Sequence, residues 1–221
     1  MLSLLRYNFL LLTFGTWLSF FLAIPIFYAV MIPPIFLYIV FVTTIILSYF
    51  YTDQRAKSTM YVASLPVKLT SIVKSRYVSV SLISFCLLFY QWGWGVLINN
   101  LFGIGIYVYT WKDIFVLAGL TILIVSLVTP IYYAVKSFLL ATGIVLIGYF
   151  LAVFYSLEPL TDVLGMEHYI IFNDLDAGFV LLVEKYVPFQ PFIMLGIVVM
   201  VLLFLSLKLS ERLFISRKRI N

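Results

Sequence analysis

The chain has little charge. Charged residues make up 10% of its 221 residues, and hydrophobic residues make up 64%. A soluble domain carries roughly a quarter charged residues, so this composition excludes a water-soluble core, because too little polar surface remains to face water. The strands of a β-barrel would alternate in polarity over about ten residues, and the apolar runs here do not. The sequence therefore predicts an all-α, polytopic membrane protein.

Residues that carry chemistry are also scarce. The single cysteine, Cys86, excludes a disulfide within the chain, and the single histidine, His168, excludes an H-E-x-x-H metalloprotease motif. There is no G-x-x-x-x-G-K-[ST] motif, and hence no P-loop for nucleotide phosphates. The acidic segment MEHYIIFNDLDAG matches no metal-ligand spacing. We therefore predict no catalytic residue and no metal site.

Six apolar runs reach the roughly 20 residues that a spanning helix needs. We predict spans at Phe9–Val30, Pro34–Tyr51, Tyr77–Ile98, Ile114–Val135, Ser137–Ser156 and Pro188–Leu207, in one transmembrane domain covering residues 1–221. These runs contain no Asp, Glu, Lys, Arg or His. Ionisable groups inside the membrane are typical of ion coupling and proton relays, so their absence argues against a transporter driven by an ion gradient.

Basic residues are concentrated on one side of this predicted topology. With six spans, both termini share a side with residues 52–76 and Lys136, and that side holds all of the 14 Lys and Arg residues except Lys112 and Lys185. The positive-inside rule places this side, with both termini, in the cytoplasm. The net charge of +5 is then a topology signal, and it does not indicate nucleic-acid binding. The basic C-terminal segment is expected to bind anionic headgroups.

Two local patterns predict further packing. Arg6 and Asn8, in a Leu- and Phe-rich background, are consistent with a short interfacial helix that leads into the first span. In the fifth span, one helix face carries small residues that allow backbones to approach closely. They are Ser137, Ala141, Gly148 and Ala152. We expect packing within the chain at this face, with a dimer interface as the alternative.

The connection between the second and third spans, DQRAKSTMYVASLPVKLTSIVKSR, begins at Asp53 and is basic. Asp53 is placed to cap a short helix over residues 54–64 by accepting hydrogen bonds from its first free amides. That helix ends near Leu65, because Pro66 disfavours helical geometry in the residue before it.

A second helix is expected to start after Pro66, since proline is tolerated in a first turn. One face of it carries an apolar stripe of Leu69, Ile72, Val73 and Tyr77. Lys68, Ser71 and Ser75 lie largely opposite. The third membrane helix thus begins within the cytoplasm. From the residues alone, residues 54–64 either contact a cytoplasmic partner or lie on anionic lipid as a basic loop.

The string SLPVKLTSIVKSRYVSV resembles the L-P-[VI]-x-x-x-x-[IV]-V-x-[SG]-[KR]-[YF] stretch of small ABC-2-type transporter permeases, the membrane subunits of bacterial ATP-binding-cassette exporters. The matching positions are Leu65, Pro66, Val67, Ile72, Val73, Ser75, Arg76 and Tyr77. The string also lies between the second and third of six spans, as in that family. The resemblance covers the whole chain in architecture and about fifteen residues in motif.

In that family, a coupling helix before the motif docks into a groove on the separate ATPase subunit. The resemblance implies that the ATPase-coupling residues here are Gln54, Arg55, Lys57, Met60, Tyr61, Val62, Leu65 and Pro66. It implies an ABC ATPase partner that binds ATP and magnesium, with no cofactor in this chain. It further implies a homodimer, or a heterodimer with a second permease, in the lipid bilayer of a bacterial cell membrane. The Tyr- and Phe-rich spans are similar to exporters of amphipathic peptides, such as the phenol-soluble modulin and lantibiotic-immunity systems.

Near the outer end of the third span, Gln91, Trp92 and Trp94 are candidates for a substrate path. An aromatic belt at the lipid interface explains the tryptophans without a ligand. Residues 157–187 form an outer loop that is either a solvated connector or a cap over the exit. Two functions are consistent with these patterns. The first is a permease that is not itself an enzyme, and the second is a non-transporting scaffold or immunity protein that binds or sequesters peptides.

Overall fold

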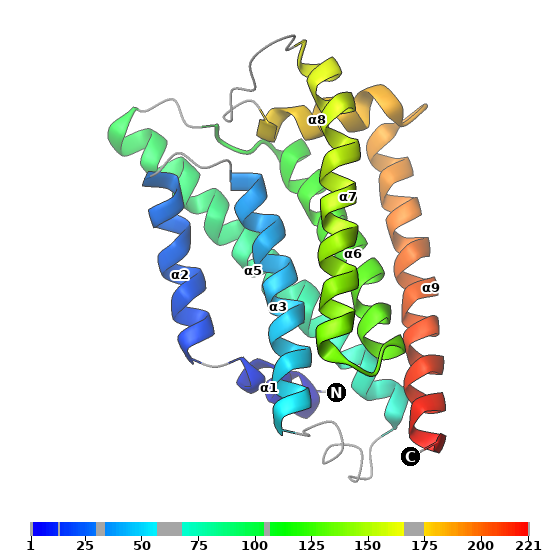
Figure 1. The fold of residues 1–221 in the computed structure, drawn as a ribbon. Helices are drawn as coiled ribbons and strands as arrows, with labels where there is room; N and C mark the ends of the chain where they lie inside the picture. The colour runs from blue at the N-terminus through cyan, green and yellow to red at the C-terminus, as the bar shows by residue number, and fades with distance from the viewer. Residues whose placement is uncertain are drawn as a thin grey trace.

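The computed structural model describes residues 2–12, 14–29, 34–56, 68–103, 107–165 and 175–220. In these ranges every regular element is an α-helix. The helices are α1 (Leu2–Leu11), α2 (Phe14–Ala29), α3 (Pro34–Ala56), α5 (Leu69–Phe102), α6 (Trp111–Ala134), α7 (Phe138–Leu164), α8 (Leu175–Tyr186) and α9 (Pro191–Ile220). The long helices run side by side as an up-and-down bundle (Figure 1). This confirms the predicted all-α membrane class.

Five described helices, α3, α5, α6, α7 and α9, are long and apolar enough to cross a membrane. The pair α1 and α2 passes the same test together but is bent by 72°, so that the described chain has five spans or up to six. The predicted run Phe9–Val30 is therefore not one straight helix, because it includes the bend between α1 and α2. Helix α1 lies across the end of the bundle (Figure 1), which agrees with the interfacial helix expected around Arg6 and Asn8.

Helix α5 is the longest described helix, with 34 residues, and it ends at Gly103 in the left-handed conformation (φ 60°). At 1.5 Å per residue it is about 51 Å long, which exceeds the roughly 30 Å hydrocarbon core of a bilayer. The span predicted at Tyr77–Ile98 thus continues beyond both of its expected ends. Because α5 begins at Leu69, the prediction of a helix start just after Pro66 is confirmed.

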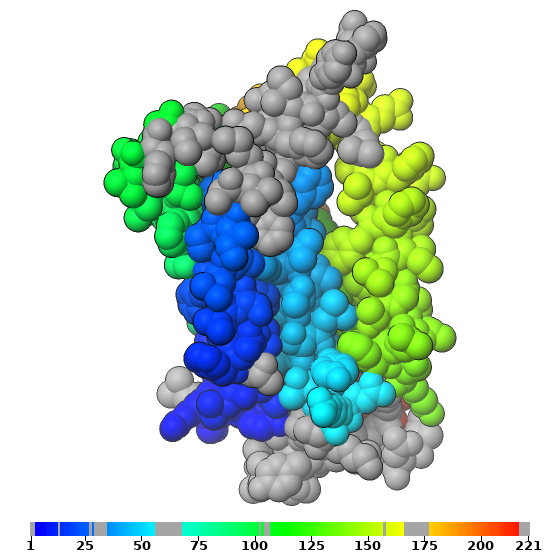
Figure 2. All heavy atoms as spheres, turned by 60° about the vertical axis from the view of Figure 1, so that its left-hand side comes forward, coloured from blue at the N-terminus to red at the C-terminus, as the bar shows by residue number. Residues whose placement is uncertain are grey.

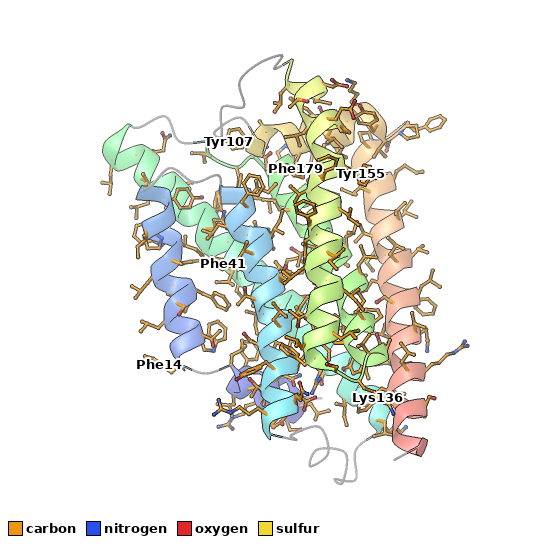
Figure 3. All side chains as sticks on the ribbon, in the orientation of Figure 1. Phe14, Phe41, Tyr107, Lys136, Tyr155 and Phe179 are labelled. Carbon is orange, nitrogen blue, oxygen red and sulfur yellow. The ribbon has the colours of Figure 1, made fainter. Side chains whose placement is uncertain are left out.

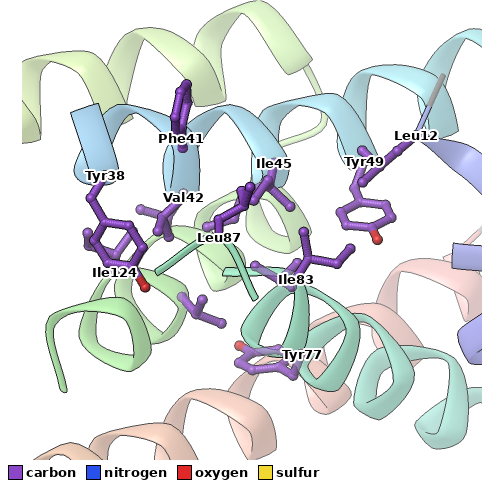
Figure 4. Close-up of a cluster of buried hydrophobic side chains, with 14 of the residues drawn as sticks. Leu12, Tyr38, Phe41, Val42, Ile45, Tyr49, Tyr77, Ile83, Leu87 and Ile124 are labelled. Carbon is purple, nitrogen blue, oxygen red and sulfur yellow. The ribbon is translucent and has the colours of Figure 1, made fainter. Parts of the chain in front are cut away.

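The core lies where α3, α5 and α6 meet (Figure 4). Val42 and Ile45 of α3, Ile83 and Leu87 of α5, and Ile124 of α6 are all at most 5% exposed. Helices α7 and α9 instead carry many exposed apolar side chains, and Figure 2 shows α7 on one face of the molecule beside α3. In a membrane such a face contacts acyl chains or another subunit. Its apolar side chains are therefore not exposed to water.

Both chain ends lie at the same end of the bundle, together with the last turn of α3, the first turn of α5 and Lys136 (Figures 1 and 3). We call this the basic end. The opposite end holds α8, the start of α6 and the start of α9 (Figure 1). Among the described residues, the helices therefore separate the basic residues as the sequence predicts, with Lys112 and Lys185 at the opposite end.

Candidate functional site

The predicted ATPase-coupling residues begin in the last turn of α3. Gln54 and Arg55 lie there and are exposed. The others, Lys57, Met60, Tyr61, Val62, Leu65 and Pro66, lie outside the described residues. The expectation that Asp53 caps a new helix is wrong, because α3 continues through Asp53 to Ala56, more than one turn beyond the predicted span end.

Asp53 instead forms a buried ion pair with Arg76 of α5. Oδ2 of Asp53 lies 2.9 Å from Nη2 of Arg76, and the two side chains are 15% and 4% exposed. The guanidinium carbon of Arg76 lies 5.3 Å from the centre of the Phe50 ring, one turn earlier on α3. Because buried charges require a counter-ion, this contact fixes the last turns of α3 against α5.

Aromatic contacts extend this joint to two more helices. Phe50 stacks on Tyr132 of α6 with ring centres 4.7 Å apart, and it meets Tyr133 edge-on at 5.3 Å. Tyr133 packs in turn against Phe214 of α9 at 5.6 Å. Aromatic pairs at these distances add to the energy of burial. The position of Phe50 is therefore coupled to α6 and α9.

The first turns of α5 follow the predicted apolar stripe. Ile72, Val73 and Tyr77 are buried and Leu69 is half-buried. Ser75, which is expected opposite this stripe, is also buried, with 1% of its surface exposed. Helix α1 packs against α5 and its polar side chains reach Ser75, so this turn of α5 is buried on two sides.

Asn8 makes the contact between α1 and α5. Its Nδ2 atom donates to Oγ of Ser75 at 3.2 Å and to Oγ of Ser79 at 3.1 Å. Asn8 is 2% exposed. An amide buried beside the membrane needs such partners, so the polar residue in this apolar helix specifies where α1 docks.

Helix α9 is joined to the same part of α5 by a chain of hydroxyl groups. The Tyr77 hydroxyl lies 2.7 Å from Oγ of Ser206 and 2.8 Å from Oγ of Ser210. Ser206 donates its proton to the backbone oxygen of Ser126 on α6 at 2.6 Å. Tyr77 therefore donates to Ser206 and accepts from Ser210. This ordered chain connects α5, α6 and α9.

Lys74 adds a half-exposed ion pair near this joint. Its Nζ atom lies 3.8 Å from Oε1 of Glu211 on α9, and the Lys74 and Glu211 side chains are 48% and 9% exposed. Glu211 also pairs with Lys208, at 3.5 Å. The structure thus places a buried and a half-exposed ion pair two residues apart on α5.

The predicted substrate-path residues make contacts near the end of α5 opposite the basic end. Gln91 is fully buried, and its Nε2 donates to the Tyr109 hydroxyl at 3.3 Å. Trp92 is 38% exposed, and its Nε1 donates to the backbone oxygen of Tyr109 at 3.2 Å. Trp94 meets Tyr90 edge-on at 6.3 Å. These contacts give all three side chains a structural role, and a substrate path at these positions stays a prediction.

The opposite end contains two features that sequence reasoning missed. Asp113 closes a capping box with Thr110 and also accepts a hydrogen bond from Tyr107 at 2.9 Å. Its signal was the Thr-x-x-Asp spacing. Lys112 pairs with Glu184 of α8 at 2.7 Å. Neither contact indicates catalysis, and in the described residues no group of three His, Cys, Asp or Glu could hold a metal.

The face of small residues predicted in the fifth span lies on α7, and it is not packed along its whole length. Ala141 is fully buried, whereas Gly148 and Ala152 are exposed, and nothing lies within 4 Å of a methyl group added at Gly148. The interpretation as packing within the chain is therefore wrong for Gly148 and Ala152 of this face. The residues of MEHYIIFND, including His168, lie outside the described residues.

These features define a multi-pass helical membrane protein in which the connection from α3 to α5 begins and ends at a network of buried contacts. A family model described as ABC-2 family transporter protein matches residues 3–215. The chain belongs to this family, and it is a membrane permease of the ABC transporter class. Comparisons with curated proteins and with solved structures gave no match. Family membership implies pairing with an ABC ATPase subunit, and such permeases are usually not themselves catalytic.

Proposed function

We propose that this chain is the membrane subunit of a bacterial ABC exporter, in which a separate ATPase powers export of a hydrophobic or amphipathic substrate such as a peptide. The observation that carries the proposal is the joint between Asp53 and Arg76, at 2.9 Å. The segment expected to bind the ATPase lies between these two residues in the chain. A partner that binds this segment therefore acts on α3 and α5 together.

In the proposed cycle, two ATPase subunits bind ATP and magnesium and close around the nucleotide. Residues 54–64 occupy a groove on one ATPase subunit and move with it. Helix α3 enters this contact and α5 leaves it, so both helices tilt when the groove moves. This chain contributes no catalytic residue to the cycle, and its part is mechanical.

The topology and assembly follow from the same proposal. The basic end faces the cytoplasm, where the ATPase resides, and the excess of Lys and Arg at that end supports this orientation. A chain with at most six candidate spans in its described part pairs with a second permease, identical or different, to enclose a path. The exposed apolar faces of α7 and α9 leave room for such a neighbour.

Purification from the native host tests the proposal. The protein is solubilised in a mild detergent and isolated by a tag, and the eluate is assayed for ATPase activity. We expect an ABC ATPase in stoichiometric amount, which is lost when residues 54–64 are replaced by a Gly/Ser linker of equal length. If a correctly inserted protein brings no ATPase with it, the proposal is wrong, and a non-transporting scaffold or peptide-sequestering protein becomes the better account.

A further inference from the structure

We infer that the Asp53–Arg76 ion pair is a positioning element, which makes the last turn of α3 and the first turns of α5 move as one body when the ATPase moves. The inference rests on the proposed function and adds the means of transmission within this chain. Asp53 and Arg76 act here through the helices that they join, and neither contacts nucleotide or substrate.

The first argument is position. Asp53 lies three residues before the end of α3 at Ala56, and Arg76 lies seven residues after the start of α5 at Leu69. The pair thus bridges the base of the segment that connects the two helices. Without this bridge, a pull on the segment could rotate one helix and leave the other in place. With it, α3 and α5 are joined where Oδ2 of Asp53 lies 2.9 Å from Nη2 of Arg76.

The second argument is the cost of separating the two charges. The Arg76 side chain is 4% exposed, and Tyr133 and Tyr7 interact electrostatically with it in addition to Asp53. Tyrosine hydroxyl groups cannot replace a carboxylate as a counter-ion. A sliding motion between α3 and α5 would leave a buried guanidinium without its counter-ion, which is strongly unfavourable. The charged pair therefore resists sliding, whereas an apolar contact would permit it.

The third argument is what the pair touches. Arg76 lies over Phe50, and Phe50 contacts Tyr132 and Tyr133 of α6. Tyr133 packs against Phe214 of α9. A displacement of the joined ends is consequently passed to α6 and α9 through side chains in direct contact. In contrast, the Lys74–Glu211 pair joins α5 to α9 directly, without these aromatic contacts, and its lysine is 48% exposed.

The test compares four variants of the permease with its ATPase in lipid nanodiscs. D53N removes one charge, and D53R/R76D exchanges the two. D53L/R76M replaces the pair by apolar side chains, a change that is often neutral or stabilising for folding. K74Q is the matched control, because it removes a neighbouring half-exposed pair and leaves Glu211 its second partner, Lys208. An environment-sensitive fluorophore on L209C of α9, in a C86S background, reports motion when ATP and vanadate trap the ATPase.

We expect the parent protein and K74Q to bind the ATPase and to show a nucleotide-dependent change in emission. D53L/R76M should fold and bind the ATPase but lose this change, and D53R/R76D should recover it. D53N should lose it as well, and if D53N fails to fold the two double variants decide the matter. A full response in folded D53L/R76M would overturn the inference and leave the proposed function intact. Absence of ATPase binding by the parent protein would instead overturn the proposed function, and the inference with it.

Discussion

The Tyr77 hydroxyl of α5 and Oγ of Ser206 on α9 lie 2.7 Å apart inside the bundle. With Ser210 and the backbone oxygen of Ser126, they form a continuous chain of hydrogen bonds across three helices. Lipid provides no hydrophobic force between helices, so association in a membrane depends on packing and on contacts such as these. Helices α5, α6 and α9 are thus held together by specific polar atoms.

Replacing Tyr77 by Phe removes this chain and leaves the Ser206 oxygen without its donor. We expect the free energy of unfolding to fall by about 0.6–2 kcal/mol, the range for hydrogen bonds between membrane helices. Unfolding by increasing denaturing detergent, followed by circular dichroism, measures the loss. Tyr51→Phe is the control, because Tyr51 is 51% exposed. Equal stability of both variants would show that the hydroxyl chain contributes nothing.

Replacing Asn8 by Ala should release α1 from α5. The change removes the donor to Ser75 and Ser79, and the two serines are then buried without it. We expect a spin label at Leu10, which is 73% exposed, to become more mobile in Asn8→Ala. Ser3→Ala, on the exposed side of α1, should leave the mobility unchanged. A label that is equally immobile in both variants would contradict docking by Asn8.

The two kinds of ion pair in this protein should differ in their effect on stability. Breaking a buried pair costs about 3–5 kcal/mol in soluble proteins, whereas exposed pairs contribute about 0.2–1 kcal/mol. Asp53→Asn should therefore lower the free energy of unfolding by an amount near the lower end of the first range, since Asp53 keeps 15% of its exposure. Lys112→Gln affects a pair whose side chains are 41% and 32% exposed, and it should change the free energy of unfolding very little. Thermal unfolding of both variants, monitored by tryptophan fluorescence, measures the difference. If Asp53→Asn were as stable as the parent protein, the prediction would be wrong.

Charges introduced into the ATPase-coupling segment should prevent binding without affecting insertion. Met60→Asp combined with Val62→Asp places two carboxylates on a surface expected to enter a groove on the ATPase. We expect the ATPase to be absent after purification, with the same amount of permease in the membrane fraction. The control is Arg212→Gln, an exposed change on α9 at the same end of the bundle. Normal ATPase recovery with Met60→Asp/Val62→Asp would refute the assignment of residues 54–64.

Cysteine labelling tests the orientation of the bundle. In a Cys86→Ser background, Arg212→Cys reports on the basic end and Asp162→Cys on the opposite end, and both positions are exposed. A membrane-impermeant maleimide added to intact cells should label Asp162→Cys, and it should label Arg212→Cys only after the cells are opened. The reverse pattern would place the basic end outside.

The sequence predicts the helices well because length and apolar content decide which segments lie in lipid. The start of α5 just after Pro66, and the buried stripe of Ile72, Val73 and Tyr77, also follow from local rules. The break between α1 and α2 was not predicted in the first span, since Phe9–Val30 is apolar throughout and hydropathy carries no information on a bend.

The candidate site depended more on tertiary contacts. Asp53 has the local features of a helix cap, and its actual role was decided by Arg76, 23 residues later in the chain, which offers a buried charge that needs a counter-ion. Ser75 is expected opposite the apolar stripe, and its own helix gives no sign that α1 covers it. The hydrogen bond from the Gln91 amide to the Tyr109 hydroxyl could not be predicted from the α5 sequence either. In each case the partner came from another element.

Helix α7 has one further consequence for handling the protein. Only 11% of the 18-residue apolar stretch of this helix is buried within the chain. Its described contacts include the hydrogen bond from Thr43 to the Tyr149 hydroxyl, at 2.7 Å. Its apolar side chains are therefore covered by whatever surrounds the chain, which is lipid, detergent or the second permease proposed above. A detergent that competes for this face during extraction would also compete with such a partner, so the choice of detergent bears on the assembly that is recovered.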